Sequence, residues 1–232
     1  MKKILGVIVC VVITITINYK EEIIKYFYDN FSKSYEKYDI PEYSGFSYVI
    51  LNNNKTYFSE DDLTFEGEYY SDLDLLGRCG YAMAKVGTDT MPNSDRESIG
   101  NIKPTGWHTV RYDNIDGNYL YNRCHLIGFQ LTGENANEKN LITCTRSMNT
   151  GVMLDYENMI ADYIKNTGNP VLYRVTPIFE ESNLLAKGVI LEGKSLEDDT
   201  IEFNIFIFNV QDGIEIDYTN GQSKRIGKLF FY

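Results

Sequence analysis

The second half of the chain changes its hydrophobic period, and this change limits what the chain can fold into. Across residues 149–167 the apolar residues recur at helical spacing, and the Gly-Asn-Pro sequence at 168–170 ends the pattern. Three apolar stretches of strand length follow, separated by short polar segments, at 171–179, 184–192 and 201–210. One dominant helix followed by consecutive strands predicts the α+β class, with the helix packed on an antiparallel β-sheet.

The first half of the chain carries shorter strand patterns and one long polar loop. Residues 46–51 and 56–58 have strand-like composition on either side of an asparagine-rich turn. Residues 87–106 are rich in Gly, Asp, Asn, Ser and Pro, which predicts a long surface loop of the kind that often carries function. Two further short strands are expected at 119–125 and 141–145.

The N-terminus has the pattern of an export signal. Lys2 and Lys3 precede an uncharged apolar run that extends from residue 4 to residue 17. Fourteen helical residues rise about 21 Å, which is less than the hydrocarbon thickness of a bilayer. Because no small-residue cleavage site follows the run, residues 1–19 are expected to be either a signal peptide or a membrane anchor. The protein is therefore expected to be secreted or anchored to the outer face of the cell membrane.

Two further segments follow the export signal. Residues 20–40 alternate apolar and charged positions at helical spacing, which predicts an amphipathic stalk helix. Residues 41–232 then form the expected folded domain, whose length suits a single core. No protein partner is predicted for it. A membrane contact is expected through the N-terminal segment where that segment stays uncleaved.

The charge balance excludes one class of nucleic-acid-binding protein. The net charge is −11, whereas proteins that coat nucleic acid present a broad basic surface. Residues 100–150 differ from the rest, because their five basic and four acidic side chains give about +1 and leave about −12 elsewhere. The composition is compatible with an enzyme that binds its substrate weakly through a local basic cleft.

The chain contains four cysteines, and three of them belong to the expected domain. Cys79, Cys124 and Cys144 permit at most one disulfide and a free thiol, and Cys79–Cys124 is a candidate pair. These cysteines and His125 also suggest a zinc site. Adjacent residues on a strand point to opposite faces, so Cys124 and His125 are not expected to bind one ion together.

One of the two histidines lies among the groups that phosphodiester cleavage needs. The imidazole of His125 titrates near neutrality and suits a general base that activates water. The amide oxygen of Asn149 suits a hard cation, and Glu157 suits a supporting position around the waters of that cation. Arg123 can contact a phosphate, and Asn140 can orient either His125 or the phosphate.

These residues lie in the segment NRCHLIGFQLTGENANEKNLITCTRSMN, which resembles the DRGH-type motif of the DNA/RNA non-specific endonucleases. The similarity is greatest to the exported nucleases of Gram-positive bacteria. It implies a ββα-metal fold with one main active-site helix, and Mg²⁺-dependent cleavage of DNA, with RNA as a second candidate substrate and Mn²⁺ as a substitute ion. It also implies that His125 is the general base, that Asn149 is the metal ligand, and that Asn140 and Glu157 support them.

The chain departs from this motif at three positions. Asn122 and Cys124 replace the Asp and Gly of the motif, and Ala161 stands where many members have an arginine on the helix. The phosphate-stabilising cation is then expected to come from Arg146 or Lys139. The side chains expected to contact nucleic acid are Arg123, Lys139 and Arg146. The alternative function is a noncatalytic, surface-anchored module that binds nucleic acid with the nuclease fold.

Overall fold

The computed structural model describes residues 38–226. The expected signal or anchor at 1–19, and the expected stalk helix up to residue 37, lie outside the described residues. Between residues 38 and 226, no helix has the length and apolar character needed to cross a membrane.

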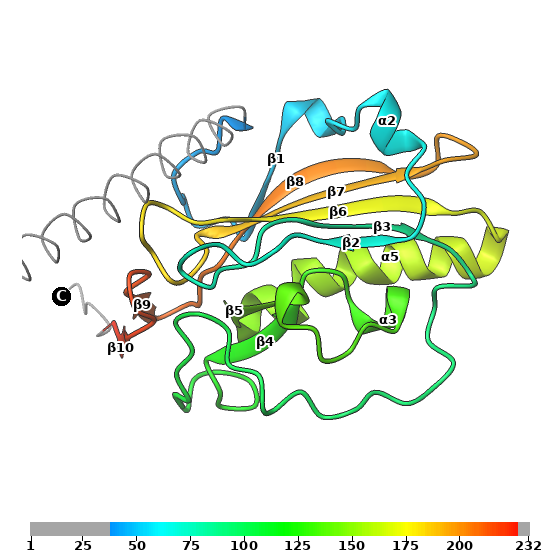
Figure 1. Cartoon of the computed structure of the whole chain (residues 1–232). Helices are drawn as coiled ribbons and strands as arrows, with labels where there is room; N and C mark the ends of the chain where they lie inside the picture. The colour runs from blue at the N-terminus through cyan, green and yellow to red at the C-terminus, as the bar shows by residue number, and fades with distance from the viewer. Residues whose placement is uncertain (1–37, 227–232) are drawn as a thin grey trace, which may run out of the picture. The chain divides into compact units, whose positions relative to one another are not determined.

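A six-stranded sheet forms the centre of the described domain (Figure 1). Its order is β1-β8-β7-β6-β3-β2, and every neighbouring pair is antiparallel. The strands are β1 (Tyr48–Ile50), β2 (Glu68–Tyr70), β3 (Ala82–Val86), β6 (Val171–Ile178), β7 (Gly188–Ser195) and β8 (Glu202–Phe208). The antiparallel sheet expected from the sequence is therefore confirmed.

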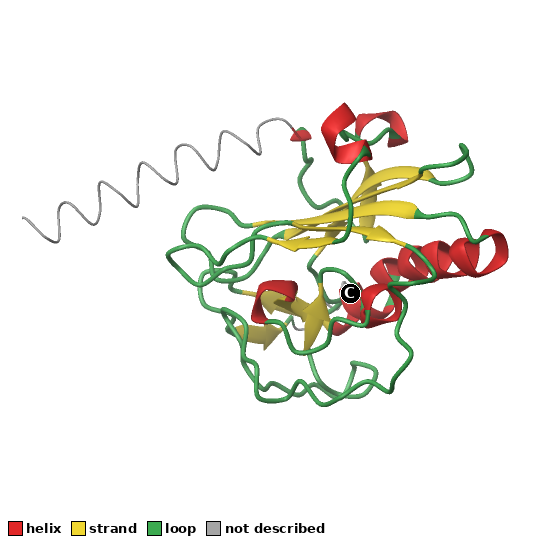
Figure 2. Cartoon of the chain, turned by 45° about the vertical axis from the view of Figure 1, so that its right-hand side comes forward, coloured by secondary structure: helices red, strands yellow, loops and turns green. Residues whose placement is uncertain are grey.

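One long helix, α5 (Val152–Thr167), covers one face of this sheet (Figures 1 and 2). Its buried residues include Ile160 and Ile164, which belong to the same core cluster as Tyr173 and Leu191 of the sheet. Burying each such side chain contributes about 1.5–3 kcal/mol, so this contact is a main source of stability. The helix ends at Gly168, whose φ of 76° is the left-handed conformation that glycine adopts readily.

A second layer lies on the same side of the sheet as α5 (Figure 2). It contains the antiparallel pair β4 (Tyr121–His125) and β5 (Leu141–Thr145), followed by the short helix α4 (Arg146–Thr150). This is the strand–strand–helix unit that the sequence predicts. The remaining elements are α2 (Glu60–Leu63), α3 (Phe129–Thr132), β9 (Ile214–Ile216), β10 (Ser223–Arg225) and short 3-10 turns at Asn52–Asn54 and Glu138–Asn140.

The strand boundaries differ from the sequence prediction at two places. No strand forms at 56–58, and the strand expected at 184–192 is shifted to β7. The shift occurs because Leu185 is buried in a small separate cluster, where its backbone N–H donates to the carbonyl of Tyr218. An apolar residue that serves another cluster looks the same in the sequence as one that begins the strand.

The helix predicted at 149–167 is in fact two helices, and Gly151 separates them. At Gly151 a Cβ atom would lie 2.6 Å from the carbonyl oxygen of Ser147, so the close approach of the backbone there requires glycine. Asn149 therefore lies at the end of α4, whereas Glu157 lies in the second turn of α5. The two residues therefore belong to different helices and not to one.

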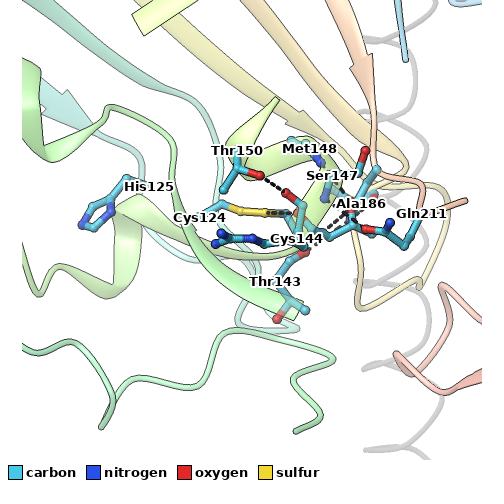
Figure 3. The surroundings of a disulfide bond; sticks show 12 residues. Cys124, His125, Thr143, Cys144, Ser147, Met148, Thr150, Ala186 and Gln211 are labelled. Carbon is cyan, nitrogen blue, oxygen red and sulfur yellow. Dashed lines mark hydrogen bonds between the residues drawn. A yellow bond between two sulfur atoms is a disulfide. The ribbon is translucent and has the colours of Figure 1, made fainter. Parts of the chain in front are cut away.

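The disulfide also differs from the candidate pair. Cys124 joins Cys144 with a Cα–Cα distance of 5.9 Å, and Cys79 is a buried free thiol. Cys124 lies opposite Ile142 in the β4–β5 ladder, two residues from Cys144, so the cysteines are diagonal neighbours on one face. Figure 3 shows the His125 ring directed away from this disulfide.

Candidate active site

His125 ends β4, and its ring is held between a backbone carbonyl and an arginine. The Nε2 atom lies 2.8 Å from the carbonyl oxygen of Asn135, and a carbonyl only accepts, so Nε2 carries the proton. The other nitrogen, Nδ1, lies 3.2 Å from Nη2 of Arg96 and keeps its lone pair. The imidazole is thus oriented with a basic nitrogen directed towards a cation.

The surroundings of His125 keep the imidazole neutral. The residue is only 6% exposed, and this burial, together with the positive charge of Arg96, lowers its pKa to about 4. The hydrogen bond to the Asn135 carbonyl raises the pKa of His125, but its effect is smaller than that of burial. A neutral imidazole is the form that accepts a proton.

His125 opens into a cavity of about 290 Å³. Side chains from four separate parts of the chain meet there: the long loop, the end of β4 with α3, the end of α4 and the start of α5. The lining residues are Arg96, His125, Gly128, Phe129, Gln130, Asn149, Thr150, Met153, Leu154 and Glu157. The predicted base and the two predicted metal-binding residues are therefore brought together in one place.

The Glu157 carboxyl group lies at the base of this cavity and is 8% exposed. Burial raises its pKa to about 8, against the opposing effects of the Gly128 N–H, the Gln130 side chain and Arg96. Any Cβ atom at Gly128 would overlap the carboxylate, so a glycine is required after β4 for Glu157 to reach this position. The contacts of the Glu157 carboxylate do not offset the cost of burying its charge. A bound cation would stabilise this charge.

The oxygen atoms of Asn149 and Glu157 fit a hard cation. Mg²⁺ is commonly held by one or two protein oxygens and keeps several of its waters. Within residues 38–226, no cluster of three or more His, Cys, Asp or Glu side chains is placed to hold a metal ion. Because Cys124 and Cys144 are bonded to each other, the zinc site considered from the sequence is excluded.

Arg96 lines the cavity although nothing in the sequence marks it as a site residue. It projects from the long polar loop that was predicted to carry function, 29 residues before His125, and no motif surrounds it. The only signal in the sequence was the loop itself. The structure brings Arg96, and not the expected Arg146 or Lys139, to the cavity.

Asn140 lies behind the cavity and not in it. Its side chain is fully buried, where Oδ1 accepts from the Ile127 N–H at 2.9 Å and Nδ2 donates to the Ile127 carbonyl at 3.0 Å. A fully buried amide cannot touch a phosphate, so that part of the prediction is wrong. Asn140 instead fixes the chain immediately after His125, which makes it a positioning residue.

Arg123 holds the long loop. Its Nε donates to the carbonyl of Ile102, its Nη2 donates to the carbonyl of Gly100 at 2.8 Å, and its guanidinium lies 4.0 Å from the centre of the Trp107 ring. Two of its three guanidinium nitrogens are therefore directed to the loop backbone. Arg123 does not line the cavity.

The other predicted nucleic-acid contacts lie on the surface away from the cavity. Lys139 forms an ion pair with Asp72 at 2.6 Å, and Arg146 forms one with Asp116 at 2.9 Å. Neither residue lines the cavity. Ala161, at the position of the missing arginine, is buried in the core beneath the sheet.

Comparison with known proteins agrees with the motif. The sequence pattern of the DNA/RNA non-specific endonuclease family matches residues 56–197. A deoxyribonuclease of Streptococcus dysgalactiae subsp. equisimilis is 32% identical over 108 residues, which cover 44% of this chain and 32% of the relative. The chain thus spans about a third of the length of that curated relative.

Solved structures share the fold over most of the chain. Magnesium-bound NucA from Streptococcus agalactiae superposes with a TM-score of 0.71 at 26% identity, covering 81% of this chain and 92% of NucA. Sda1 nuclease with bound zinc gives a TM-score of 0.63 at 25% identity, covering 75% of this chain and 95% of Sda1. The chain belongs to the DNA/RNA non-specific endonuclease family.

Proposed function

We propose that the chain is a metal-dependent endonuclease that hydrolyses phosphodiester bonds in DNA. One observation carries the proposal: Arg96, His125, Asn149 and Glu157 line a single cavity. A base, a cation for the phosphate and oxygen ligands for a metal are the groups that such hydrolysis needs. The similarity to a deoxyribonuclease supports DNA as the substrate class, and RNA is the second substrate to test.

His125 acts as the general base in this proposal. Its Nδ1 takes a proton from the attacking water while Nε2 remains bonded to Asn135, which holds the ring in one tautomer. Without substrate, Arg96 donates to Nδ1. A phosphate oxygen is a stronger acceptor than imidazole, so a bound phosphodiester draws Arg96 away and frees the base.

Asn149 and Glu157 are the residues that would hold the metal. A bound Mg²⁺ would supply positive charge against the phosphate oxygens and the leaving oxygen. Mn²⁺ is expected to replace it, because both ions take oxygen ligands. The neutral amide of Asn149 leaves more of the positive charge of the ion for the substrate than a second carboxylate would. Magnesium in the NucA structure supports the choice of ion.

Export belongs to the same proposal. The apolar run after Lys2 and Lys3 supports secretion or anchoring on the outer face of the membrane. The disulfide between Cys124 and Cys144 is also typical of a protein that works outside the reducing cytoplasm. With a net charge of −11, substrate binding is expected to be weak and to weaken further with salt.

Plasmid degradation with the two single-histidine variants tests the function. With Mg²⁺ present, His125→Ala is expected to lower the rate by about a hundred- to ten-thousandfold, which is the range for a lost general base. His108→Ala is the matched control, because His108 is exposed and bonds to the carbonyl of Asn220 away from the cavity. His108→Ala should cleave the plasmid as the wild type does. A metal chelator should stop cleavage by the wild type and by His108→Ala.

The noncatalytic alternative predicts a different result from the same assay. A module that only binds nucleic acid would leave the plasmid intact with wild-type protein, with or without Mg²⁺, while still retarding it in a gel. Degradation that survives His125→Ala would remove His125 as the base and leave the nuclease assignment standing.

A further inference from the structure

A second cavity, of about 520 Å³, lies beside β5, and the catalytic proposal does not use it. Its volume falls within the range of about 300–1,000 Å³ that small-molecule sites occupy. One wall is the loop segment 101–105, and β5 contributes its first two residues. The remaining lining residues are Leu73, Gly77, Cys79 and Glu138.

This cavity is tied to the catalytic histidine by the β4–β5 ladder. Leu141 lines the cavity and is the direct ladder partner of His125, so their Cα atoms are about 5 Å apart. Ile102, which also lines this cavity, is held by Arg123, which precedes His125 by two residues and shares its face of β4. One pair of strands therefore sets the positions of both cavities.

The walls combine apolar and polar groups in similar amounts. Leu73, Ile102, Pro104, Leu141 and Ile142 supply the apolar surface. Asn101 and Lys103 are exposed at the opening.

The remaining lining groups decide between a phosphate and a base. Burial raises the pKa of the Cys79 thiol to about 12, so this group is neutral, and the opposite charges of Lys103 and Glu138 in the lining offset each other. A phosphate gains little from a lining without net charge. A flat, neutral heterocycle fits this lining better, with its apolar faces against the apolar side chains and its polar edges towards Asn101 and Lys103.

We propose that this cavity binds one unpaired nucleobase of the substrate strand, next to the phosphate at His125. The inference rests on the proposed nuclease function and adds a subsite to it. With a net charge of −11, the domain gains little from phosphate contacts, and an inserted base supplies affinity that salt does not screen. Bases of a duplex are stacked and paired, and removing one costs the energy of that stacking and pairing. The subsite therefore favours single-stranded substrate.

Filling the cavity tests this inference. Leu73→Trp places a large ring against the cavity, and Leu75→Trp is the matched control, because Leu75 is 68% exposed and does not line it. Each full-length variant is assayed with Mg²⁺ on a short single-stranded DNA oligonucleotide and on a plasmid duplex. Leu73→Trp is expected to raise KM for the oligonucleotide about tenfold, as the loss of one apolar contact would, with kcat unchanged. Plasmid cleavage and both activities of Leu75→Trp should stay within twofold of the wild type.

Two outcomes overturn the subsite. One is an unchanged KM for the oligonucleotide, and the other is an equal loss on both substrates, which a structural defect would cause. If Leu73→Trp lowers the melting temperature by more than a few degrees, the same two assays are made with Asn101→Trp and judged by the same criteria. Asn101 lines the cavity but is exposed, so a tryptophan there should not unfold the protein. An inactive wild type would refute the proposed nuclease itself, whereas an active wild type with unchanged KM values refutes only the subsite.

Discussion

The six-stranded sheet and the β4–β5 layer are held together by different kinds of interaction. In the sheet, β6, β7 and β8 pair over seven or eight residues each, and most of their side chains are buried. The β4–β5 layer has only two five-residue strands. It depends on a disulfide and on two buried amides, Asn140 and Asn209, that bind backbone groups.

This difference determines where a single substitution can change the geometry of the site. The stability of the sheet is spread over many apolar contacts, so no single contact decides the geometry of the site. The position of His125, in contrast, depends on the neighbouring disulfide and on the two hydrogen bonds of Asn140 to Ile127. Changes in the β4–β5 layer and its loop should therefore lower activity before they unfold the protein, and the following predictions test this in order of expected effect on activity.

Arg96→Ala should have the largest effect in this series. It removes the guanidinium beside Nδ1 of His125, which is expected to stabilise charge on the phosphate, and such a loss lowers kcat by about a hundredfold or more. Because Arg96 lies in an exposed loop, the melting temperature should stay unchanged. Steady-state cleavage of a labelled oligonucleotide and thermal unfolding measure the two quantities.

Arg111→Ala is the control for this prediction. Arg111 also belongs to the long segment between β3 and β4, but it stacks on Tyr119 at 4.4 Å and does not line the cavity. Its activity should equal that of the wild type. A similar loss in both variants would mean that the net charge of the segment matters, and not the place of Arg96.

The two buried amides allow a direct comparison between a residue that positions the site, Asn140, and a residue that stabilises the β4–β5 layer, Asn209. Asn140→Ala frees the Ile127 backbone next to the site, and should lower kcat about tenfold and stability by about 1–3 kcal/mol. Asn209→Ala removes bonds to Thr143, Thr145 and Ala186, which join β5 to the chain before β7. It should cost similar stability with little change in kcat. Urea unfolding and kcat at 25 °C separate the two, and equal kcat losses would contradict the positioning role of Asn140.

Breaking the disulfide should have a smaller effect on activity at 25 °C. Cys124 and Cys144 are 20 residues apart, and a bridge over a loop of this length contributes about 3 kcal/mol. A dithiol reductant should lower the melting temperature and, because Cys124 precedes His125, reduce kcat severalfold. Cys79→Ala should respond as the wild type does, whereas the Cys124→Ala/Cys144→Ala variant should no longer respond. A reductant effect that persists in the double variant would exclude the disulfide as its cause.

The sequence predicted the parts of the molecule that repeat a simple period. The strands at 141–145 and 171–178 and the helix up to residue 167 follow directly from apolar spacing. The break at Gly151 and the start of β7 did not, because the first depends on the close approach of Gly151 to the Ser147 carbonyl and the second on the contact of Leu185 with Tyr218. A glycine within a helical pattern has several meanings that only the neighbouring chain distinguishes.

The same limit applies to the site. His125, Asn149 and Glu157 were predicted as site residues because they lie in a recognisable motif, and the structure places them around one cavity. Arg96 was missed because a loop residue reaches the cavity through the path of the chain, which no local pattern encodes. Arg123 and Asn140 were identified as important for the wrong reason, since motif spacing does not distinguish a group that touches substrate from one that holds the backbone.

The pH dependence of cleavage should show the smallest effect, and it tests whether the β4–β5 layer stays closed around His125. A base works only when deprotonated, so activity is lost as the pH falls through its pKa. For a free imidazole that loss would be centred near pH 6.5. Burial and Arg96 lower the pKa of His125 to about 4, so with saturating Mg²⁺ the rate should change little between pH 7 and pH 5.5. Initial rates of oligonucleotide cleavage at constant ionic strength measure this, with His108→Ala to exclude the other histidine. A midpoint near 6.5 would mean that water reaches His125 in solution, and that the layer holding the site is more open than the sheet beneath it.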